Sequence, residues 1–158
     1  MEAISKNGKE FKHIADWLVA IDKASFDKIP KILLSKAKKL KNNLLGSIKE
    51  EIVLHGDLHH DNVIHHKDRW LAIDPKGVLG EREFEVAAFN FIHQSELSQE
   101  NISELFLYRV DRLANRLNLD SQRIADWVFV RLVLAVCWMV EDNNDPTRFI
   151  KLIELYGY

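Results

Sequence analysis

The stretch HGDLHHDNVIHHKDRWLAID, residues 55–74, decides the fold and the chemistry that we expect of this chain. Asp57 precedes Asn62 by five positions, and Asp74 follows twelve positions later at the end of the strand-like run WLAID. A loop carboxylate can accept a proton from a hydroxyl, and an amide oxygen and a second carboxylate are ligands that Mg²⁺ accepts. This spacing therefore predicts a phosphoryl-transfer site in which a base and a metal lie together.

The sequence on either side of the loop predicts a small amount of β structure. A short apolar run at 52–54 leads into the loop, and segments 62–65 and 69–73 flank a His-Lys-Asp turn. Pro75, Gly77 and Gly80 make the next stretch a predicted loop. We therefore expect a short strand and a β-ribbon that together carry the polar residues.

The rest of the chain predicts helices. We expect them at 10–23, from Pro30 to Gly46 with a solvated Lys-rich face, from Glu83 onward, and at roughly 99–117, 121–141 and 147–155. The helix at 121–141 is apolar almost all round, although Arg131 interrupts it, so it should be central and buried. The predicted fold class is α+β, mostly helical, in a single domain over residues 1–158.

Composition places the chain among ordinary globular proteins. It has 158 residues, of which 47% are hydrophobic and 29% charged. The single Cys137 rules out an internal disulfide, and the start MEAISKNGKEF contains no apolar signal segment. The longest apolar run, 127–140, is too short to span a bilayer. We expect a cytoplasmic protein with no membrane partner.

Charge is unevenly distributed along the chain. Residues 1–50 carry a net charge of +5 and residues 51–158 carry −7. An acidic cleft would suit Mg²⁺ and a cationic small-molecule substrate. Glu141, Asp142 and Asp145 crowd the end of the buried helix, either to recognise such a substrate or simply as solvated acids. No basic stripe with interleaved aromatic residues is present, so we expect no nucleic-acid binding.

Three residues outside the acid–amide–acid set have candidate supporting roles. His55 is expected to orient the loop through a hydrogen bond. Glu85 would accept backbone N–H groups of the loop, or would only be a favourable acid in the first turn of a helix. Lys76 follows Asp74 closely enough to contact a phosphate or a substrate, or would be an exposed surface residue.

Five of the seven histidines lie between 55 and 66, which raises two other metal-based interpretations. A zinc site is disfavoured because the histidines come in adjacent pairs, whose side chains diverge on a strand or turn. The run Gly56-Asp57-Leu58-His59 resembles the opening motif of metallophosphoesterases. Those enzymes need further ligands on later loops, and only His93 follows, so this remains a remote alternative.

A family resemblance extends over nearly all of the chain. HGDLHHDN followed by WLAIDPKGVLGEREFEVAAF resembles the catalytic region of the aminoglycoside phosphotransferases, and most closely the streptomycin 6-phosphotransferase group, the aminoglycoside/hydroxyurea antibiotic resistance kinases. The Asp-Pro-Lys-Gly run at 74–77 is the part of the resemblance that is specific to this group rather than to aminoglycoside kinases in general. RLANRLNLD at 112–120 and CWMVED at 137–142 also have counterparts in that group.

The resemblance implies a protein-kinase-like C-terminal lobe whose β-ribbon carries the catalytic loop. It implies ATP-dependent phosphorylation of an alcohol group on a small molecule, with ATP and Mg²⁺ required. Streptomycin, hydroxyurea and an ordinary metabolite are all open as acceptors. By this resemblance Asp57 is the base, Asn62 and Asp74 bind the metal, and His55 and Glu85 support the loop. It extends to Glu141 and Asp142 as substrate contacts only weakly.

The first 50 residues depart from the family pattern. Members of the family have an N-terminal, mainly β lobe with a phosphate-covering loop, whereas residues 1–50 read as helices and no Gly-rich loop occurs. We expect a chain without the N-terminal lobe that covers the phosphates of ATP in the family. The alternatives are a catalytically impaired lobe that acts as a binding module, or a lobe that needs a separate N-terminal partner. An apolar face left uncovered would favour self-association.

Overall fold

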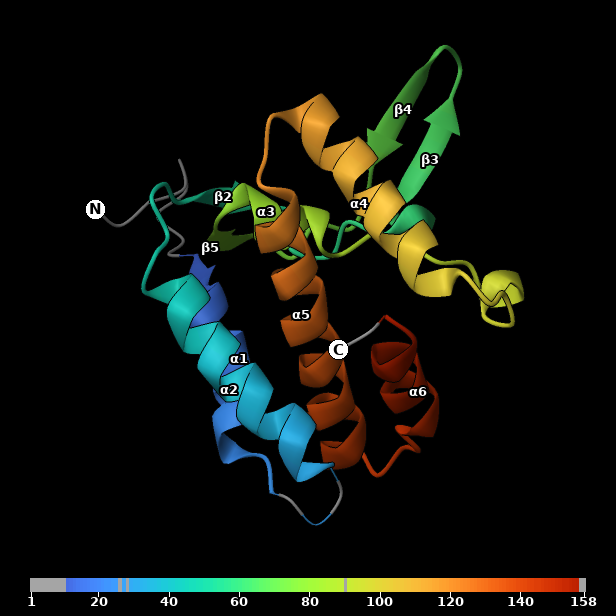
Figure 1. Ribbon diagram of the computed structural model, residues 1–158. Helices are drawn as coiled ribbons and strands as arrows, with labels where there is room; N and C mark the ends of the chain where they lie inside the picture. Colours follow the sequence, from blue (N-terminus) through green and yellow to red (C-terminus); the bar gives the residue numbers. More distant parts are fainter. Residues whose placement is uncertain (1–10, 26, 28, 90, 157–158) are drawn as a thin grey trace.

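Helix α5 (Ser121–Glu141) runs through the middle of the structure, as its apolar sequence predicts (Figure 1). The computed structural model describes residues 11–25, 27, 29–89 and 91–156. Its other helices are α1 (Ile14–Lys23), α2 (Lys31–Leu45), α3 (Arg82–Val86), α4 (Ile102–Leu117) and α6 (Thr147–Leu155), with short 3₁₀ turns η1 (His60–Asn62) and η2 (Gln94–Glu96). Mixed α and β structure that is mostly helical is confirmed.

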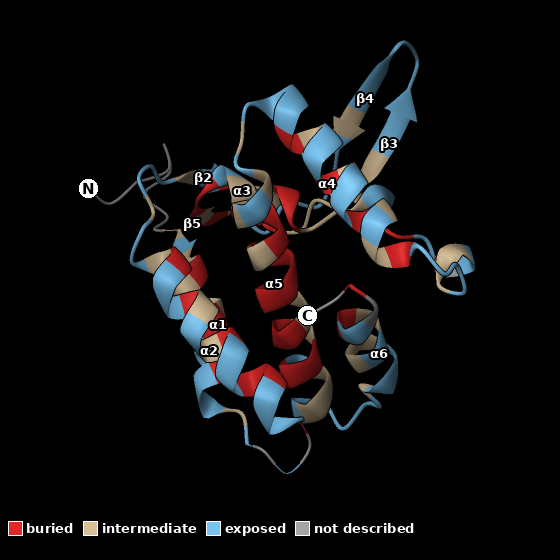
Figure 2. Cartoon of the chain, in the orientation of Figure 1, coloured by how far each residue is buried: buried red, intermediate tan, exposed pale blue. Residues whose placement is uncertain are grey.

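The core forms around α5. This helix packs against α1, α2, α3, α4 and α6, and its surface is buried on nearly every side (Figure 2). The fully buried Phe84 of α3 meets Trp127 of α5 edge-on, with ring centroids 5.0 Å apart, and contacts Trp17 of α1 at 6.4 Å. A row of aromatic rings thus connects three helices beneath the loop at 55–62.

The first two helices begin and end at specific residues. We predicted a helix at 10–23; residue 10 lies outside the described residues, and the helix begins at Ile14. His13 is the N-cap of α1. Its Nδ1 accepts the Ala15 N–H while the Asp16 carboxylate accepts the His13 N–H, an arrangement known as a capping box. Pro30 and Gly46 flank α2 as predicted.

The Lys-rich face of α2 is not fully solvated. Lys41 is buried and its ammonium is hydrogen-bonded to the carboxylate of Asp22, at the end of α1. The prediction of a solvated Lys face is therefore wrong at Lys41. The neighbouring Lys39 is exposed.

The β structure forms two separate small sheets. The first has the order β1-β5-β2, from Lys12–His13, Val78–Gly80 and Ile52–Leu54, with β1 parallel and β2 antiparallel to β5. The prediction of a loop at 75–80 is wrong for β5, whose three residues form the middle strand. Gly80 suits this place because a Cβ there would lie 2.8 Å from Ile14 Cγ2, too close for a side chain.

The second sheet is the predicted ribbon. β3 (Val63–His66) and β4 (Arg69–Ala72) pair antiparallel, with Ile64 opposite Leu71 and His65 opposite Trp70. The hairpin projects from the body of the structure (Figure 1) and is largely exposed, including Trp70 at 70%. Within the part of the chain that the structure describes, no helix has the length and apolar character that crossing a membrane requires.

Candidate active site

The loop begins at a glycine that no other residue could replace without strain. Gly56 follows β2 with φ +85°, in the left-handed region. A Cβ at this position would lie 2.9 Å from the ring of Trp17 and 3.0 Å from Val78 Cγ1. The chain therefore passes tightly over the core at Gly56, and this close passage sets where Asp57 emerges.

Asp57 is partly exposed and is surrounded by loop contacts. The amide nitrogen of Asn62 donates to the Asp57 carbonyl at 2.8 Å and lies 3.5 Å from its Oδ2. His55 Nδ1 accepts the Asp57 N–H at 3.3 Å. Since Nδ1 accepts, Nε2 carries the proton and donates to the Ile73 carbonyl at 2.8 Å. His55 therefore connects the loop to the strand end, as expected from the sequence.

Asp74 is brought to the loop through the residue before it. The Ile73 N–H donates to the Asn62 carbonyl at 2.9 Å, so the backbone of Ile73 is held by Asn62 on one side and by His55 on the other. Asp74 itself has φ 57°, a left-handed conformation that Asp tolerates better than most residues. The acid, the amide and the second acid thus lie in one neighbourhood.

Both acids face a single ammonium group. Lys76 Nζ lies 2.6 Å from Asp74 Oδ2 and 3.8 Å from Asp57 Oδ2. The hydrogen bond from Lys76 lowers the pKa of Asp74, and the same bond raises the pKa of Lys76. The Lys76 backbone N–H also donates to the His55 carbonyl at 2.8 Å, which keeps this residue beside the loop. The space between the carboxylates is one that favours a cation.

The donor set fits a magnesium ion carried by a phosphate ligand. Because the amide nitrogen of Asn62 is engaged by Asp57, the amide oxygen is the end that can bind a cation. Asn62 and Asp74 would supply two hard oxygen ligands, and Mg²⁺ usually completes its octahedron with water and substrate phosphates. Among the described residues, no group of three or more His, Cys, Asp or Glu side chains could hold a metal ion, as a metallophosphoesterase would require.

Side chains of two helices, α3 and α5, form hydrogen bonds with the backbone of Gly56. Glu85 of α3 accepts the Gly56 N–H at 3.0 Å, which is one of the two alternatives that the sequence left open for this residue. Arg131 of α5 donates from Nη2 to the Gly56 carbonyl at 3.3 Å. Sequence reasoning did not identify Arg131 as a site residue, although a charged residue inside an apolar helix was its visible signal.

Glu141 and Asp142 are not brought to the loop. Both are exposed at the C-terminal end of α5, and Glu141 lies ten residues beyond Arg131, about 15 Å along the helix axis. The nearby Asp145 precedes α6 and accepts both the hydroxyl and the N–H of Thr147, which lowers the pKa of Asp145.

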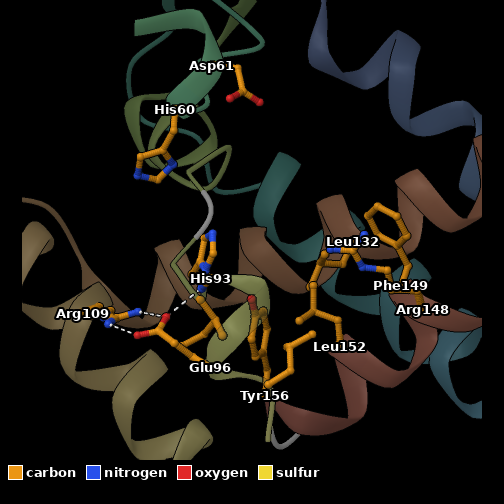
Figure 3. Close-up of a pocket in the computed structure, with 12 residues that line it drawn as sticks. His60, Asp61, His93, Glu96, Arg109, Leu132, Arg148, Phe149, Leu152 and Tyr156 are labelled. Atoms are coloured by element: carbon orange, nitrogen blue, oxygen red, sulfur yellow. Dashed lines mark hydrogen bonds and ion pairs between the residues drawn. The ribbon is translucent and has the colours of Figure 1, made fainter.

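A cavity of about 650 Å³ opens beside the loop (Figure 3). It is lined by η1, the segment after α3 and parts of α4, α5 and α6: His60, Asp61, Ile92, His93, Glu96, Leu97, Arg109, Leu132, Arg148, Phe149, Leu152 and Tyr156. Two acids and two arginines make this lining formally balanced in charge, so the acidic cleft expected from composition is not found here.

One wall of the cavity contains an ion pair between Glu96 and Arg109. Arg109 holds the Glu96 carboxylate with two hydrogen bonds of 2.7 Å. The hydrogen bond from Arg109, and then the one from the His93 N–H, lowers the pKa of Glu96 to about 2. With Glu96 paired to Arg109, the other carboxylate of this lining is the exposed Asp61, which belongs to the loop itself.

A loop carboxylate beside a cavity, with an amide hydrogen-bonded to its residue and a second carboxylate that faces the same cation, is typical of a phosphotransferase that uses a metal-bound nucleotide. The chain belongs to the aminoglycoside/hydroxyurea antibiotic resistance kinase family, whose model matches residues 9–143. The resemblance stated from the sequence is thereby confirmed.

Individual relatives agree with the family. A streptomycin 3''-kinase from Klebsiella pneumoniae is 36% identical over 118 residues, covering 70% of this chain and 43% of that protein. A streptomycin 6-kinase from Streptomyces glaucescens is 28% identical over 150 residues, covering 85% and 49%. A hydroxyurea phosphotransferase from Kitasatospora aureofaciens is 36% identical over 108 residues, covering 65% and 29%. The chain thus spans less than half the length of these curated relatives. Comparison with solved structures gave no significant match.

Proposed function

We propose that this chain carries the phosphoryl-transfer site of a small-molecule kinase. Magnesium ATP would supply the phosphoryl group and leave as ADP, and its Mg²⁺ would supply the positive charge that stabilises the group in transfer. Asp57 orients the acceptor hydroxyl and takes its proton, while Asn62 and Asp74 provide oxygen ligands for the metal. The observation that carries the proposal is that Asp57 and Asp74 converge on one cation, the Lys76 ammonium.

Lys76 has a second part in this proposal. Its ammonium lies between the two acids, where it offsets their mutual repulsion. When the metal is held by Asp74, the same flexible side chain can turn to a phosphate oxygen, a contact that lysine makes as a point charge. Lys76 is therefore the proposed nucleotide contact of this chain.

The hairpin offers a surface for the base of the nucleotide. Ile64 of β3 lies opposite Leu71 of β4, so these two share one face of the ribbon, and Ile73 follows directly after β4 and precedes Asp74. Ile64 is 41% exposed and Ile73 is 39% exposed. An apolar strip that ends at the proposed metal-binding acid suits a nucleotide: its planar nucleobase would pack on the strip, and its phosphates would reach that acid.

The acceptor is proposed to bind in the cavity beside η1. His60 and Asp61 belong to the same loop as Asp57, so a ligand in the cavity lies close to the proposed base. The apolar floor from Leu132, Phe149 and Leu152 suits the face of a ring. Asp61 would meet a cationic group of the acceptor. The names of the relatives make streptomycin and hydroxyurea the first acceptors to test.

The test is transfer of labelled γ-phosphate from magnesium ATP to streptomycin, hydroxyurea and a panel of aminocyclitols. The chain is compared with Asp57→Asn, and with Asp68→Asn as a matched control on the exposed hairpin turn. Loss of the base should lower kcat about 10²- to 10⁴-fold while the Kd for ATP is kept, and Asp68→Asn should behave like the unmodified chain.

Two results would change the proposal. Full activity in Asp57→Asn would refute the role of Asp57 as base. Magnesium-dependent ATP binding without transfer to any acceptor would instead favour a binding module, the second candidate.

A further inference from the structure

Arg131 is a charged side chain at the centre of the most apolar helix. It lies in the middle of α5, and its guanidinium group packs over the ring of the fully buried Phe84 at 4.4 Å from the centroid. Nη2 reaches the Gly56 carbonyl at 3.3 Å. Nη1 is shielded from solvent and has no hydrogen-bond partner among the described residues. The guanidinium is thus held by stacking and by one directed contact.

Glu85 approaches the same residue from the other side. Its Oε2 accepts the Gly56 N–H at 3.0 Å, and its Oε1 is likewise buried without a partner in the described part of the chain. Both backbone hydrogen-bonding groups of Gly56 are therefore held by charged side chains of opposite sign, from α3 and from α5. Charge-assisted hydrogen bonds of this kind are stronger than neutral ones.

Holding Gly56 in this way controls the next residue. The carbonyl that Arg131 contacts belongs to the peptide bond between Gly56 and Asp57. The N–H of the same peptide, that of Asp57, is held by His55 Nδ1 at 3.3 Å, whereas Gly56, with φ +85° and no side chain, adds no side-chain restraint of its own. The direction of that carbonyl determines where the Asp57 backbone leads, and with it where the carboxylate lies.

The position of Arg131 is unfavourable for a charged side chain, so packing alone does not explain why an arginine lies there. Burial lowers the pKa of Arg131 to about 10, while the nearby Glu85 and Asp57 carboxylates act in the opposite direction. The group stays charged at neutral pH. Buried charges are weak evidence for a stabilising role, because a whole buried ion pair can often be replaced by apolar residues without loss of stability. Stability of the core therefore does not by itself account for an arginine here.

We propose that Arg131 is a positioning residue: it holds the carbonyl of the Gly56–Asp57 peptide while Glu85 holds the N–H of the preceding peptide, and together they keep the Asp57 carboxylate in place for the acceptor hydroxyl. This inference rests on the proposed function for its catalytic consequence. Its geometric part, restraint of the loop at 55–62 by Arg131, stands independently of turnover.

The experiment compares Arg131→Met and Arg131→Lys with Arg123→Met. Arg123 lies in the same helix but pairs with Glu81, Ser47 and the Leu44 carbonyl, away from the loop, so it is a matched control for loss of an α5 arginine. Two readouts are taken on each purified chain: hydrogen exchange of the peptides that cover 54–62, and kcat and KM for both substrates.

Arg131→Met should speed exchange of the loop amides and lower kcat about 100-fold, the effect of a misplacement of roughly 1 Å, with KM values nearly unchanged. Arg131→Lys keeps a positive donor and should recover part of both. Arg123→Met should lower thermal stability more, yet leave loop exchange and kcat close to those of the parent. If Arg131→Met does not fold, Arg131→Lys against Arg123→Met carries the same comparison.

The inference is overturned if Arg131→Met keeps the loop exchange and the kcat of the parent. It is also overturned if Arg131→Met and Arg123→Met loosen the whole chain alike, because Arg131 would then serve only general stability. Absence of transfer in the parent chain would count against the proposed function alone, since the exchange comparison needs no turnover.

Discussion

Replacing Glu81 with Ala is expected to destabilise the fold more than loss of any single surface acid. Glu81 is 5% exposed and precedes α3. Its carboxylate accepts the Arg123 Nε–H at 2.8 and 2.9 Å, and it also accepts the indole N–H of the fully buried Trp127. One side chain therefore connects the start of α3 to two positions on α5.

The magnitude follows from what the substitution leaves behind. Breaking a buried ion pair typically costs about 3–5 kcal/mol. Arg123 keeps its contacts with Ser47 and the Leu44 carbonyl, which favours the lower end of that range, while a Trp127 N–H left without an acceptor adds about 1 kcal/mol. We expect Glu81→Ala to lower the free energy of unfolding by about 4 kcal/mol, or Tm by about 8–16 °C for a domain of this size.

Urea and thermal unfolding measure this change, with Glu81→Gln and Glu83→Ala as comparisons. The amide oxygen of Gln still accepts one hydrogen bond, so Glu81→Gln should cost about half as much. Glu83 lies in the first turn of α3, so Glu83→Ala should remove only its favourable interaction with the helix dipole and cost less than about 1 kcal/mol. A cost for Glu81→Ala that matches that of Glu83→Ala would refute the assigned network.

Three further predictions concern charged groups elsewhere. Because Arg109 lowers the pKa of Glu96 from 4.5 to about 2, their pairing stabilises the fold above pH 4.5 and is lost as the pH falls toward 2; acid titration followed by circular dichroism should lose this part of its slope in Glu96→Gln. Asp22→Ala leaves the buried Lys41 ammonium unpaired and should cost about 3 kcal/mol in urea unfolding, whereas Lys41→Met should be nearly neutral. Lys76→Met removes the ammonium that competes for the metal position. Mn²⁺ should therefore bind a few-fold more tightly in a titration followed by electron paramagnetic resonance, while phosphoryl transfer falls.

The parts of the fold that were predictable from the sequence are those determined by local patterns. The central helix α5 follows from its continuous apolar surface, and the ends of α2 follow from Pro30 and Gly46. The hairpin at 63–72 follows from alternation around a polar turn. In each case the signal lies within a few residues of the structure that it predicts.

The features that sequence reasoning missed depend on distant residues. Strand β5 is three residues long, too short for periodicity, and it forms only because β1 and β2 lie beside it. Lys41 is buried because Asp22, nineteen positions earlier, is there to pair with it. In each case the deciding neighbour could be identified only after the chain was folded.

The same division runs through the active site. The proposed chemistry of Asp57, Asn62 and Asp74 was predicted from their spacing, because proton acceptance and metal ligation depend on the type of side chain. Their placement depends on groups from other elements: Glu85 and Arg131 hold Gly56, and the Ile73 backbone is held between His55 and Asn62. Phosphoryl transfer depends mainly on positioning and electrostatics. A substitution at Arg131 should therefore impair this site while every residue of the recognisable motif remains in place.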